Sequence, residues 1–498
     1  MPWPAVGAAD CAVLREMENV MKTFSAFSVP KSAAVRPGFP SPRALSWNRR
    51  RFLAISAAAG PVLFGLAPRG RAAGGSRRER PRLAAVGVGG VGHGQVQALE
   101  KAGFEIRVLC DVDDVHAQKS YDRWPDARRY RDFREMFQAE GDRIDAVYCG
   151  VPDHTHAVIV MEALRRRKPI CCVKPLTRTI HEARVLRRAA REAGVATQMT
   201  AAPNTSEAAC RTCELIQAGA LGPVREVHLW TNRPLWPQGM TRPPGSDPVP
   251  DTLDWDLWLG PAPKRPFKRE WPAGSLPLTQ VWASHGHPPF HTVYHPWNFR
   301  GWWDFGTGAL GDMGCHYFNT PFRALRLRHP VAIEASSTMV TDETAPLASV
   351  VTYDFPARGG LPPVRLIWYD GGIRPPVPRE LADDGLAPEG ILYVGDEGLM
   401  LDREIFPESR ARQFADVPRT LPRRGGTWAE FAEACAGGEP AGCAFDWAVP
   451  LTETVLLGNI AIRVGKPLRW DGPAGRFTNS DAANALVRQP YHNGWTLG

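Results

Sequence analysis

The sequence predicts an α/β protein whose first folded part is a doubly wound parallel sheet and whose second part combines strands with helices. Two observations predict the first part: short apolar runs alternate with helical stretches between residues 82 and 199, and a glycine-rich turn follows the first run. Strands that alternate with helices at this spacing form parallel sheets with helices on both faces. A third observation, a series of strand patterns followed by two helices between 330 and 470, predicts the second part.

The length and charge of the chain indicate a globular protein and give no support to a nucleic-acid-binding one. The chain has 498 residues, enough for two or three domains, and its 44% hydrophobic and 22% charged content is ordinary for a soluble globular protein. The net charge is +8, but residues 1–73 hold ten Lys and Arg against three Asp and Glu. The remainder is close to neutral, so we expect no nucleic-acid partner, because phosphate binding needs a basic face.

The basic N-terminal stretch has its own interpretation. Ser46-Trp-Asn-Arg-Arg-Arg-Phe-Leu53 is a twin-arginine pattern, followed by a fifteen-residue apolar run over 52–66 and by Ala72-Ala73. We expect an extension without fixed structure over 1–48, a Tat export signal over 49–73, and a periplasmic or otherwise exported protein. The apolar run is shorter than the about 20 residues that span a bilayer, so we expect no permanent membrane anchor. An arginine-rich disordered tail is the alternative.

Residues 82–111 carry the strongest functional signal. Gly87, Gly89 and Gly92 match G-x-G-x-x-G between two apolar runs, and Asp111 follows nineteen positions after the last glycine. This is the dinucleotide-binding fingerprint, in which glycines let the backbone approach a pyrophosphate at a helix N-terminus. We expect the turn, with Gly90 and Val91, to bind the cofactor. Asp111 would bind the ribose hydroxyls and repel a 2′-phosphate, which favours NAD over NADP.

Two later strands end in polar residues. The apolar strand over 144–149 runs into a loop with Pro152, His154 and His156, and the strand over 169–173 runs into Lys174-Pro175. Ligands bind beyond the carboxyl ends of parallel strands, so we expect these residues to line the cofactor site. A surface lysine at a strand end is the alternative for Lys174. A helix over 180–193 and a strand over 196–199 complete the alternation.

The cysteines are too few and too scattered for a disulfide framework. Cys210 and Cys213 form C-x-x-C within a predicted helix over 210–222, without a second pair, and we expect buried thiols there. Cys435 and Cys443 flank a Gly/Pro loop and could pair in an oxidising compartment, although reduced, packed side chains are the expected state.

Four histidines lie in or just beyond a Pro/Gly-rich insertion over 267–293: His285, His287, His291 and His295. No clustered Asp, Glu or Cys accompanies them. We therefore expect no metal site, and interpret them as polar groups that line a cleft or as side chains without a function.

A second chemical centre follows at 297–316. If its glycine-rich part opens a helix, Asp312 and His316 share one face, four residues apart. A carboxylate beside an imidazole orients the ring, as a general base requires. The spacing alone favours an ordinary helical ion pair.

The rest of the chain predicts the second part of the fold. We expect a strand over 224–230, further strands over 331–337, 348–355, 364–369 and 390–394, and helices over 428–436 and 450–465. The segment from 471 to 498 carries three aromatic residues, and we expect it to form a tail that packs on the rest of the protein.

These residues resemble the Gfo/Idh/MocA oxidoreductases, specifically the exported members. The matching stretches are the glycine turn, VPDHTHAV, VKPLTRTIHEAR, the strand that begins at Pro223, and GTGALGDMGCH, and the resemblance covers most of residues 82–497. It implies a Rossmann domain over 80–202, then an α+β substrate and oligomerisation domain over 203–470 with an open, largely antiparallel sheet. The active site would lie in the cleft between them. Members act on sugars, inositols and related polyols with a nicotinamide cofactor that is often tightly held.

The resemblance also implies roles for residues. Lys174, Asp312 and His316 would bind the substrate hydroxyl and transfer its proton, and we expect Arg300, Trp302 and Trp303 to contact substrate, although tryptophans are equally typical of a core. Two departures stand out. Val173 replaces the glutamate of the family's Glu-Lys-Pro motif, and the run over 200–204, TAAPN, replaces Gly-Asn-Gln-Gly-His.

The sequence therefore predicts hydride transfer between tightly bound NAD and a secondary alcohol of a sugar, glycoside or polyol. One alternative is redox-neutral glycoside cleavage through a transient keto-sugar. Another is a non-catalytic protein that binds NAD or sugar. A homo-oligomer, dimer or tetramer, is expected because an open sheet needs its outer face covered.

Overall fold

The computed structural model describes residues 80–272, 292–381 and 385–497. The predicted extension over 1–48, the predicted export signal over 49–73, and His285, His287 and His291 lie outside the described residues.

The first part of the chain forms a six-stranded, all-parallel sheet with strand order β3-β2-β1-β4-β5-β6. Its strands are β1 (Arg82–Val86), β2 (Glu105–Cys110), β3 (Arg128–Tyr130), β4 (Ala146–Cys149), β5 (Ile170–Val173) and β6 (Thr197–Thr200). The connecting helices are α2 (Val91–Lys101), α3 (Asp114–Arg123), α4 (Phe133–Glu140), η1 (Gly141–Arg143), α5 (Asp153–Arg165) and α6 (Ile180–Ala193). This strand order is that of the doubly wound dinucleotide-binding fold, which confirms the predicted class.

Local signals explain why some element bounds are predictable. Helix α6 begins with a capping box, in which Thr179 and Glu182 satisfy each other's backbone N–H groups, and ends at Gly194 with φ 65°. Both signals are legible in the sequence, and they stop the helix at its two ends.

The second part forms a nine-stranded sheet with order β13-β12-β11-β7-β10-β9-β8-β14-β15. Its strands are β7 (Val224–Trp230), β8 (Ala332–Ser337), β9 (Ser349–Phe355), β10 (Val364–Tyr369), β11 (Gly390–Gly395), β12 (Leu399–Leu401), β13 (Glu404–Phe406), β14 (Leu468–Asp471) and β15 (Arg476–Phe477). Only the β7–β10 pair is parallel. The predicted largely antiparallel sheet is confirmed, although β12 to β15 were not predicted.

The helices of this part are α7 (Glu207–Gln217), α8 (Trp255–Leu259), η2 (Asn298–Gly301), α10 (Gly308–Ala324), η3 (Arg379–Leu381), α11 (Glu408–Gln413), α12 (Thr427–Cys435), α13 (Phe445–Val464) and α14 (Asp481–Val487). The prediction that a helix begins at Pro450 is wrong: α13 begins five residues earlier and passes through this proline. Nearly all of α13 is buried, and tertiary packing of that kind outweighs the backbone hydrogen bond that a proline removes.

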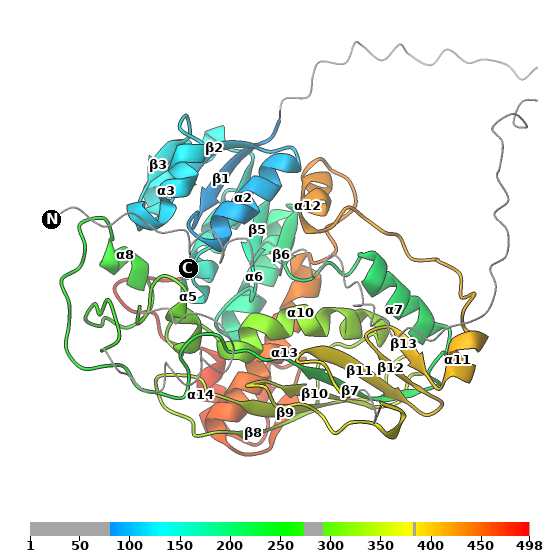
Figure 1. Ribbon diagram of the computed structural model, residues 1–498. Helices are drawn as coiled ribbons and strands as arrows, with labels where there is room; N and C mark the ends of the chain where they lie inside the picture. The colour runs from blue at the N-terminus through cyan, green and yellow to red at the C-terminus, as the bar shows by residue number, and fades with distance from the viewer. Residues whose placement is uncertain (1–79, 273–291, 382–384, 498) are drawn as a thin grey trace, which may run out of the picture. The chain divides into compact units, whose positions relative to one another are not determined.

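Helix α13 joins the two sheets. It contacts α6 and β6 of the first sheet, α10 beside it, and β8 and β9 of the second sheet (Figure 1). The tail also returns to the first part, where Tyr491 Oη donates to Glu182 Oε1 at 2.6 Å. These contacts hold the start of α10 at the carboxyl edge of the parallel sheet.

Three further observations concern the described residues. None of their helices is long and apolar enough to cross a membrane. Their nine cysteines are all free, and Cys210 and Cys213 are buried in α7. Within residues 80–272, 292–381 and 385–497, no group of three or more His, Cys, Asp or Glu side chains is placed to hold a metal ion.

Candidate active site

The glycine-rich turn joins β1 to α2, and its backbone packs too closely for side chains. A Cβ at Gly87, where φ is 77°, would lie 2.6 Å from the carbonyl carbon of Gly150, and a Cβ at Gly92 would lie 2.2 Å from the oxygen of Gly87. Helix α2 follows, with Gly90 as its N-cap and Val91 as its first residue. The first N–H groups of a helix have no intrahelical acceptor, so this edge of the sheet offers donors to an anion.

Asp111, at the end of β2, faces this turn. Its Oδ2 accepts hydrogen bonds from Val88 N at 2.8 Å and Gly89 N at 3.2 Å, and its Oδ1 accepts one from Asp113 N at 3.1 Å. Only 8% of the residue is exposed. The carboxylate therefore holds the turn in shape, and its contact with ribose hydroxyls stays a prediction.

Two histidines that the sequence analysis did not assign to the cofactor lie against the same turn. The His116 ring packs on Gly89, where an added Cβ would come within 2.1 Å of the ring. His295 meets His116 edge-on at 5.1 Å, and its Nε2 lies 3.0 Å from Asp113 Oδ2. His295, from the second part of the chain, thus contacts the ring that covers the glycine turn, and no local sequence pattern signals this long-range contact.

The side chains of His154 and His156 lie in the interior of the fold. His154 is 1% exposed, with Nε2 2.9 Å from Trp258 O and Nδ1 3.3 Å from Phe305 O. Burial lowers its pKa to about 3. His156 is fully buried, with Nδ1 2.8 Å from Pro175 O. Both imidazoles bind backbone carbonyls and are buried, so their rings stabilise the fold, and the predicted cofactor binding at these two positions stays a prediction.

The start of α5 adds a carboxylate that the sequence analysis passed over. Pro152 is the N-cap of this helix, and Asp153 is its first residue. Asp153 is buried and accepts a hydrogen bond from Thr307 Oγ1 at 2.8 Å, just before α10 begins. Burial raises the pKa of Asp153. Its place within the VPDHTH loop was a usable signal, because that loop follows a buried strand.

Lys174, directly after β5, contacts the second chemical centre. Its Nζ lies 2.7 Å from Asp312 Oδ1, and Arg300 Nε lies 3.0 Å from the same oxygen. The three side chains are only 17%, 12% and 16% exposed, so solvent screens their attraction weakly. The carboxylate beside Lys174 therefore comes from Asp312, whereas Val173 occupies the position of the family's glutamate.

The charges around Asp312 set its protonation and that of His316, one helical turn further along α10. Burial alone would raise the pKa of Asp312, but Lys174 and Arg300 hold it well below its usual range. Burial is the main reason that the pKa of His316 is lowered to about 3, and the charge of Lys174 lowers it further. The charge of Asp312 acts in the opposite direction but is outweighed. The site thus combines an anion, two cations and a neutral, partly exposed imidazole.

A further polar group, also missed by the sequence analysis, lies near His316. Arg233, three residues beyond β7, contributes to the lowered pKa of His316 and lies 2.7 Å from Glu389 Oε1. Thr231 Oγ1 donates to the same oxygen at 2.9 Å. Because Arg233 follows the end of a strand, its position could have identified it, but Glu389 reaches the site only through the β7–β11 pairing.

The three residues predicted to contact substrate, Arg300, Trp302 and Trp303, lie in different surroundings. Trp302 is fully buried in a core cluster and donates to Val293 O at 2.9 Å, so the prediction that it stacks on a sugar is wrong. Trp303 is 6% exposed and lies against Arg463, not beside Lys174. Arg300 does lie in the site, where its guanidinium stacks on Trp297 at 4.4 Å and binds Asp312.

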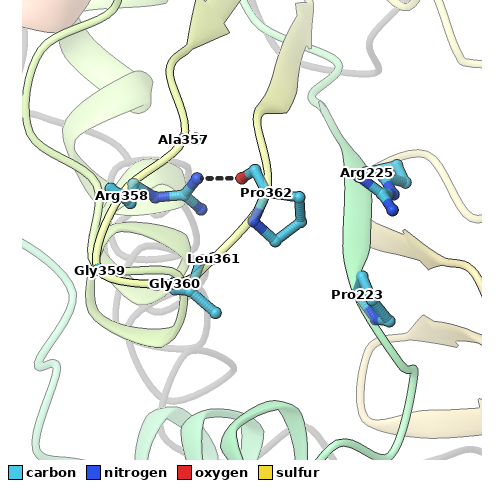
Figure 2. A pocket seen from close by; sticks show the side chains of 8 residues that line it. All are labelled: Pro223, Arg225, Ala357, Arg358, Gly359, Gly360, Leu361 and Pro362. Atoms are coloured by element: carbon cyan, nitrogen blue, oxygen red, sulfur yellow. Dashed lines mark hydrogen bonds between the residues drawn. The ribbon is translucent and has the colours of Figure 1, made fainter.

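An open hollow elsewhere on the molecule is not this site. It is lined by Pro223, Arg225, Ala357, Arg358, Gly359, Gly360, Leu361 and Pro362 (Figure 2). Arg225 is paired with Asp396 at 2.7 Å, and Arg358 donates to the carbonyl of Pro362 at 2.7 Å. Its charged groups are already bound, and Lys174, Asp312 and His316 do not line it.

Comparison with known proteins agrees with the fold of the first part of the chain. Residues 82–201 match the model of a family described as an oxidoreductase family with an NAD-binding Rossmann fold. An inositol 2-dehydrogenase of Arthrobacter sp. (strain FB24) is 37% identical over 101 residues, which is 20% of this chain and 29% of that protein. One from Rubrobacter xylanophilus is 32% identical over 118 residues, 23% of this chain and 33% of that protein. The chain thus matches about a third of the length of these curated relatives.

Two solved structures share the fold over most of the chain. GenD2 from gentamicin A biosynthesis, solved with NAD, has a TM-score of 0.52 at 19% identity and covers 82% of this chain and 100% of that one. The WlbA dehydrogenase of Chromobacterium violaceum, solved with NADH and UDP-GlcNAcA, has a TM-score of 0.53 at 14% identity, covering 80% and 97%. At these identities the likeness extends to the fold alone.

Proposed function

We propose that this chain is a member of the Gfo/Idh/MocA family of oxidoreductases and transfers a hydride between NAD and a secondary alcohol of a sugar, glycoside or polyol. The observation that carries the proposal is the contact between Lys174 and Asp312, one turn before His316. An ammonium, a carboxylate and an imidazole meet there at the carboxyl edge of the parallel sheet, where ligands of this fold bind.

The residues at the glycine turn fit a dinucleotide. The backbone at Gly87 and Gly92 leaves no space for a Cβ, and the N-terminus of α2 supplies N–H donors for a pyrophosphate. NAD, when bound, supplies the hydride acceptor. Asp111 disfavours a 2′-phosphate through its charge, which supports NAD rather than NADP.

The chain's own residues then handle the proton. Lys174 and Arg300 hold Asp312 as an anion, and Lys174 donates a hydrogen bond to the substrate hydroxyl oxygen. His316 is neutral near pH 7, so a ring nitrogen accepts the hydroxyl proton as the C–H bond breaks. Asp312 stabilises the resulting imidazolium.

Three further features belong to the proposal. We propose that the cofactor is tightly held, with His116, His295 and Asp113 beside the glycine turn slowing its release. A dimer or tetramer would cover Val350, Ile367 and Val394, which are partly buried hydrophobic residues of the second sheet. The twin-arginine pattern supports export, and an Arg49→Lys/Arg50→Lys variant that still reaches the periplasm would contradict it.

One experiment tests the central proposal. The purified full chain is denatured, the released nucleotide is identified by chromatography, and the native protein is screened against sugars and polyols at the nicotinamide absorbance band. We expect released NAD(H) and a change in absorbance with at least one polyol. A keto-sugar product supports net oxidation, and free sugar without net NADH supports redox-neutral glycoside cleavage instead. If nucleotide is bound but its absorbance never changes, the result supports a non-catalytic binding protein. If the protein neither contains nor binds a nucleotide, all three proposed functions are contradicted.

A further inference from the structure

A second cavity lies where α6 and α10 begin, against α13 and α14. Its walls are Arg178, Thr179, Ile180, Trp303, Gly306, Thr307, Leu456, Asn459, Ile460, Arg463, Leu486 and Gln489. Lys174, Asp312 and His316 do not line it. Along α13, it lies beyond Thr452, whose Oγ1 is 3.3 Å from Leu176 N near the proposed active site. The cavity is therefore distinct from that site.

Two guanidinium groups in this cavity have unused hydrogen-bond donors. Arg178 is 6% exposed and donates from Nη1 to Asp304 O at 2.6 Å, while its Nε has no acceptor among the described residues. Arg463 is half-buried, has neither a hydrogen-bond acceptor nor a carboxylate within 4.0 Å in the described part of the chain, and holds its guanidinium 5.4 Å from the Trp303 ring. The Arg178 Nε is buried, and a buried donor is costly when it remains unpaired, whereas Arg463 is half-buried.

The neighbouring carboxylates do not match these charges. Asp304 is bound to a third arginine, Arg265, through a short side-chain contact. Glu182 accepts from Thr179 N at 2.9 Å and from Tyr491 Oη at 2.6 Å. Asp304 and, more weakly, Asp342 act on Arg463 only as more distant charges. Among the described residues, no carboxylate is therefore in direct contact with either guanidinium.

We infer that this cavity binds a small oxyanion, either a phosphate or sulfate ion or the carboxylate of a small molecule. Guanidinium groups bind such oxygens through paired, charge-assisted hydrogen bonds, and the Arg178 Nε and the Arg463 guanidinium supply the donors. Gln489 adds a neutral polar group to the wall, and Trp303 covers one side. The inference does not depend on the proposed hydride transfer, because it uses none of the same side chains.

Thermal unfolding of the full chain tests the inference. Sodium phosphate, sulfate and acetate are each titrated up to about 10 mM at constant ionic strength, because a ligand that binds only the folded state raises its stability with concentration. We expect at least one of them to raise the midpoint. Arg463→Gln should weaken that anion's apparent affinity about tenfold or more, since a charged hydrogen bond is lost. Arg469→Gln, which removes the same charge from the exposed surface of β14, should leave it unchanged.

A second variant keeps the test decisive if Arg463→Gln folds poorly. Gln489→Glu would place a carboxylate in the cavity wall, so the variant should be at least as stable as the wild type without added anion, and should no longer respond to it. A response to acetate but not phosphate identifies a carboxylate ligand, and the reverse identifies a phosphate. The inference is overturned if none of the three anions raises the midpoint, or if both cavity variants respond as the wild type does.

Discussion

The ammonium of Lys174 lies 2.7 Å from Asp312 Oδ1, and the Nε of Arg300 lies 3.0 Å from the same oxygen. One carboxylate on α10 thus holds two cations, one from the end of β5 and one from the 3₁₀ helix η2. The three side chains come from segments far apart in the sequence, and the contact ties the two parts of the chain together at the proposed active site.

Asp312→Asn should be strongly destabilising, because it leaves Lys174 and Arg300 buried without their counter-charge. We expect the free energy of unfolding in urea to fall by about 3 kcal/mol, and Lys174→Met in the same background to recover part of the loss. Asp396→Asn, which breaks the exposed pair with Arg225, should cost less than about 1 kcal/mol. Equal losses at the two aspartates would contradict the structural role of the contact.

His316 should remain neutral across the physiological pH range. Burial and the charge of Lys174 lower its pKa to about 3, so the imidazole takes up a proton only under strongly acidic conditions. We expect no change in its ring resonances between pH 5 and 8 in an NMR titration, with His316→Gln used to assign them. A ring that titrates with a pKa near 6.5 would contradict the burial of His316 and its closeness to the charge of Lys174.

His154 should make stability depend on pH. Its pKa is about 3 in the folded protein and about 6.5 in an unfolded chain. Below pH 6.5 the unfolded chain therefore binds a proton that the folded chain excludes. The stabilising contribution is complete above pH 6.5 and falls by about 1.4 kcal/mol for each pH unit below it.

The measurement compares urea unfolding of the wild type and His154→Gln from pH 8 to pH 5. The difference between the two should be constant above pH 7 and shrink by about 2 kcal/mol at pH 5. A difference that stays constant over the whole range would show that the folded ring accepts a proton.

Gly89→Ala should disturb the cofactor turn through His116. The new methyl group would lie 2.1 Å from the imidazole, so we expect a loss of about 1 to 3 kcal/mol in stability and weaker NADH binding by fluorescence. Removing the ring in Gly89→Ala/His116→Ala should restore most of the stability. Gly94→Ala is the control: it sits in α2 with nothing within 4 Å, so it should cost nothing and stabilise the helix slightly. Similar behaviour of the two single variants would argue against the packing of His116 on the turn.

Substitutions of Trp302 should change the free energy of unfolding and leave the affinity for substrate unchanged. Trp302 is fully buried among aromatic side chains, so Trp302→Ala should lower the free energy of unfolding by about 3 to 5 kcal/mol. Trp302→Phe should keep the fold and leave KM for any substrate found in the screen unchanged. A several-fold rise in KM for the phenylalanine variant, without loss of stability, would restore the predicted sugar contact.

The parts of the fold that could be predicted carry local signals. Helix α6 has its capping box and terminal glycine, β7 and β10 have the predicted bounds, and the glycine turn needs glycines because its backbone touches the end of β4. The short strands β12 to β15 have weaker patterns and form only because longer strands offer them an edge. Helix α13 begins before the predicted Pro450 because burial, not propensity, stabilises its first turns.

The sequence by itself determined the class of fold, the dinucleotide turn, and the residue types of the proposed centre at Lys174, Asp312 and His316. Periodicity, glycines and strand ends act over a few residues, so they can be read without coordinates. Only the tertiary structure decided what each side chain touches. It places Asp312 against Lys174 and Arg300, and it directs the Asp111 carboxylate to the backbone of the glycine turn. It also buries His154 and Trp302, and it brings Arg178 and Arg463 to one cavity. Those contacts join residues that are far apart along the chain, and packing sets their distances.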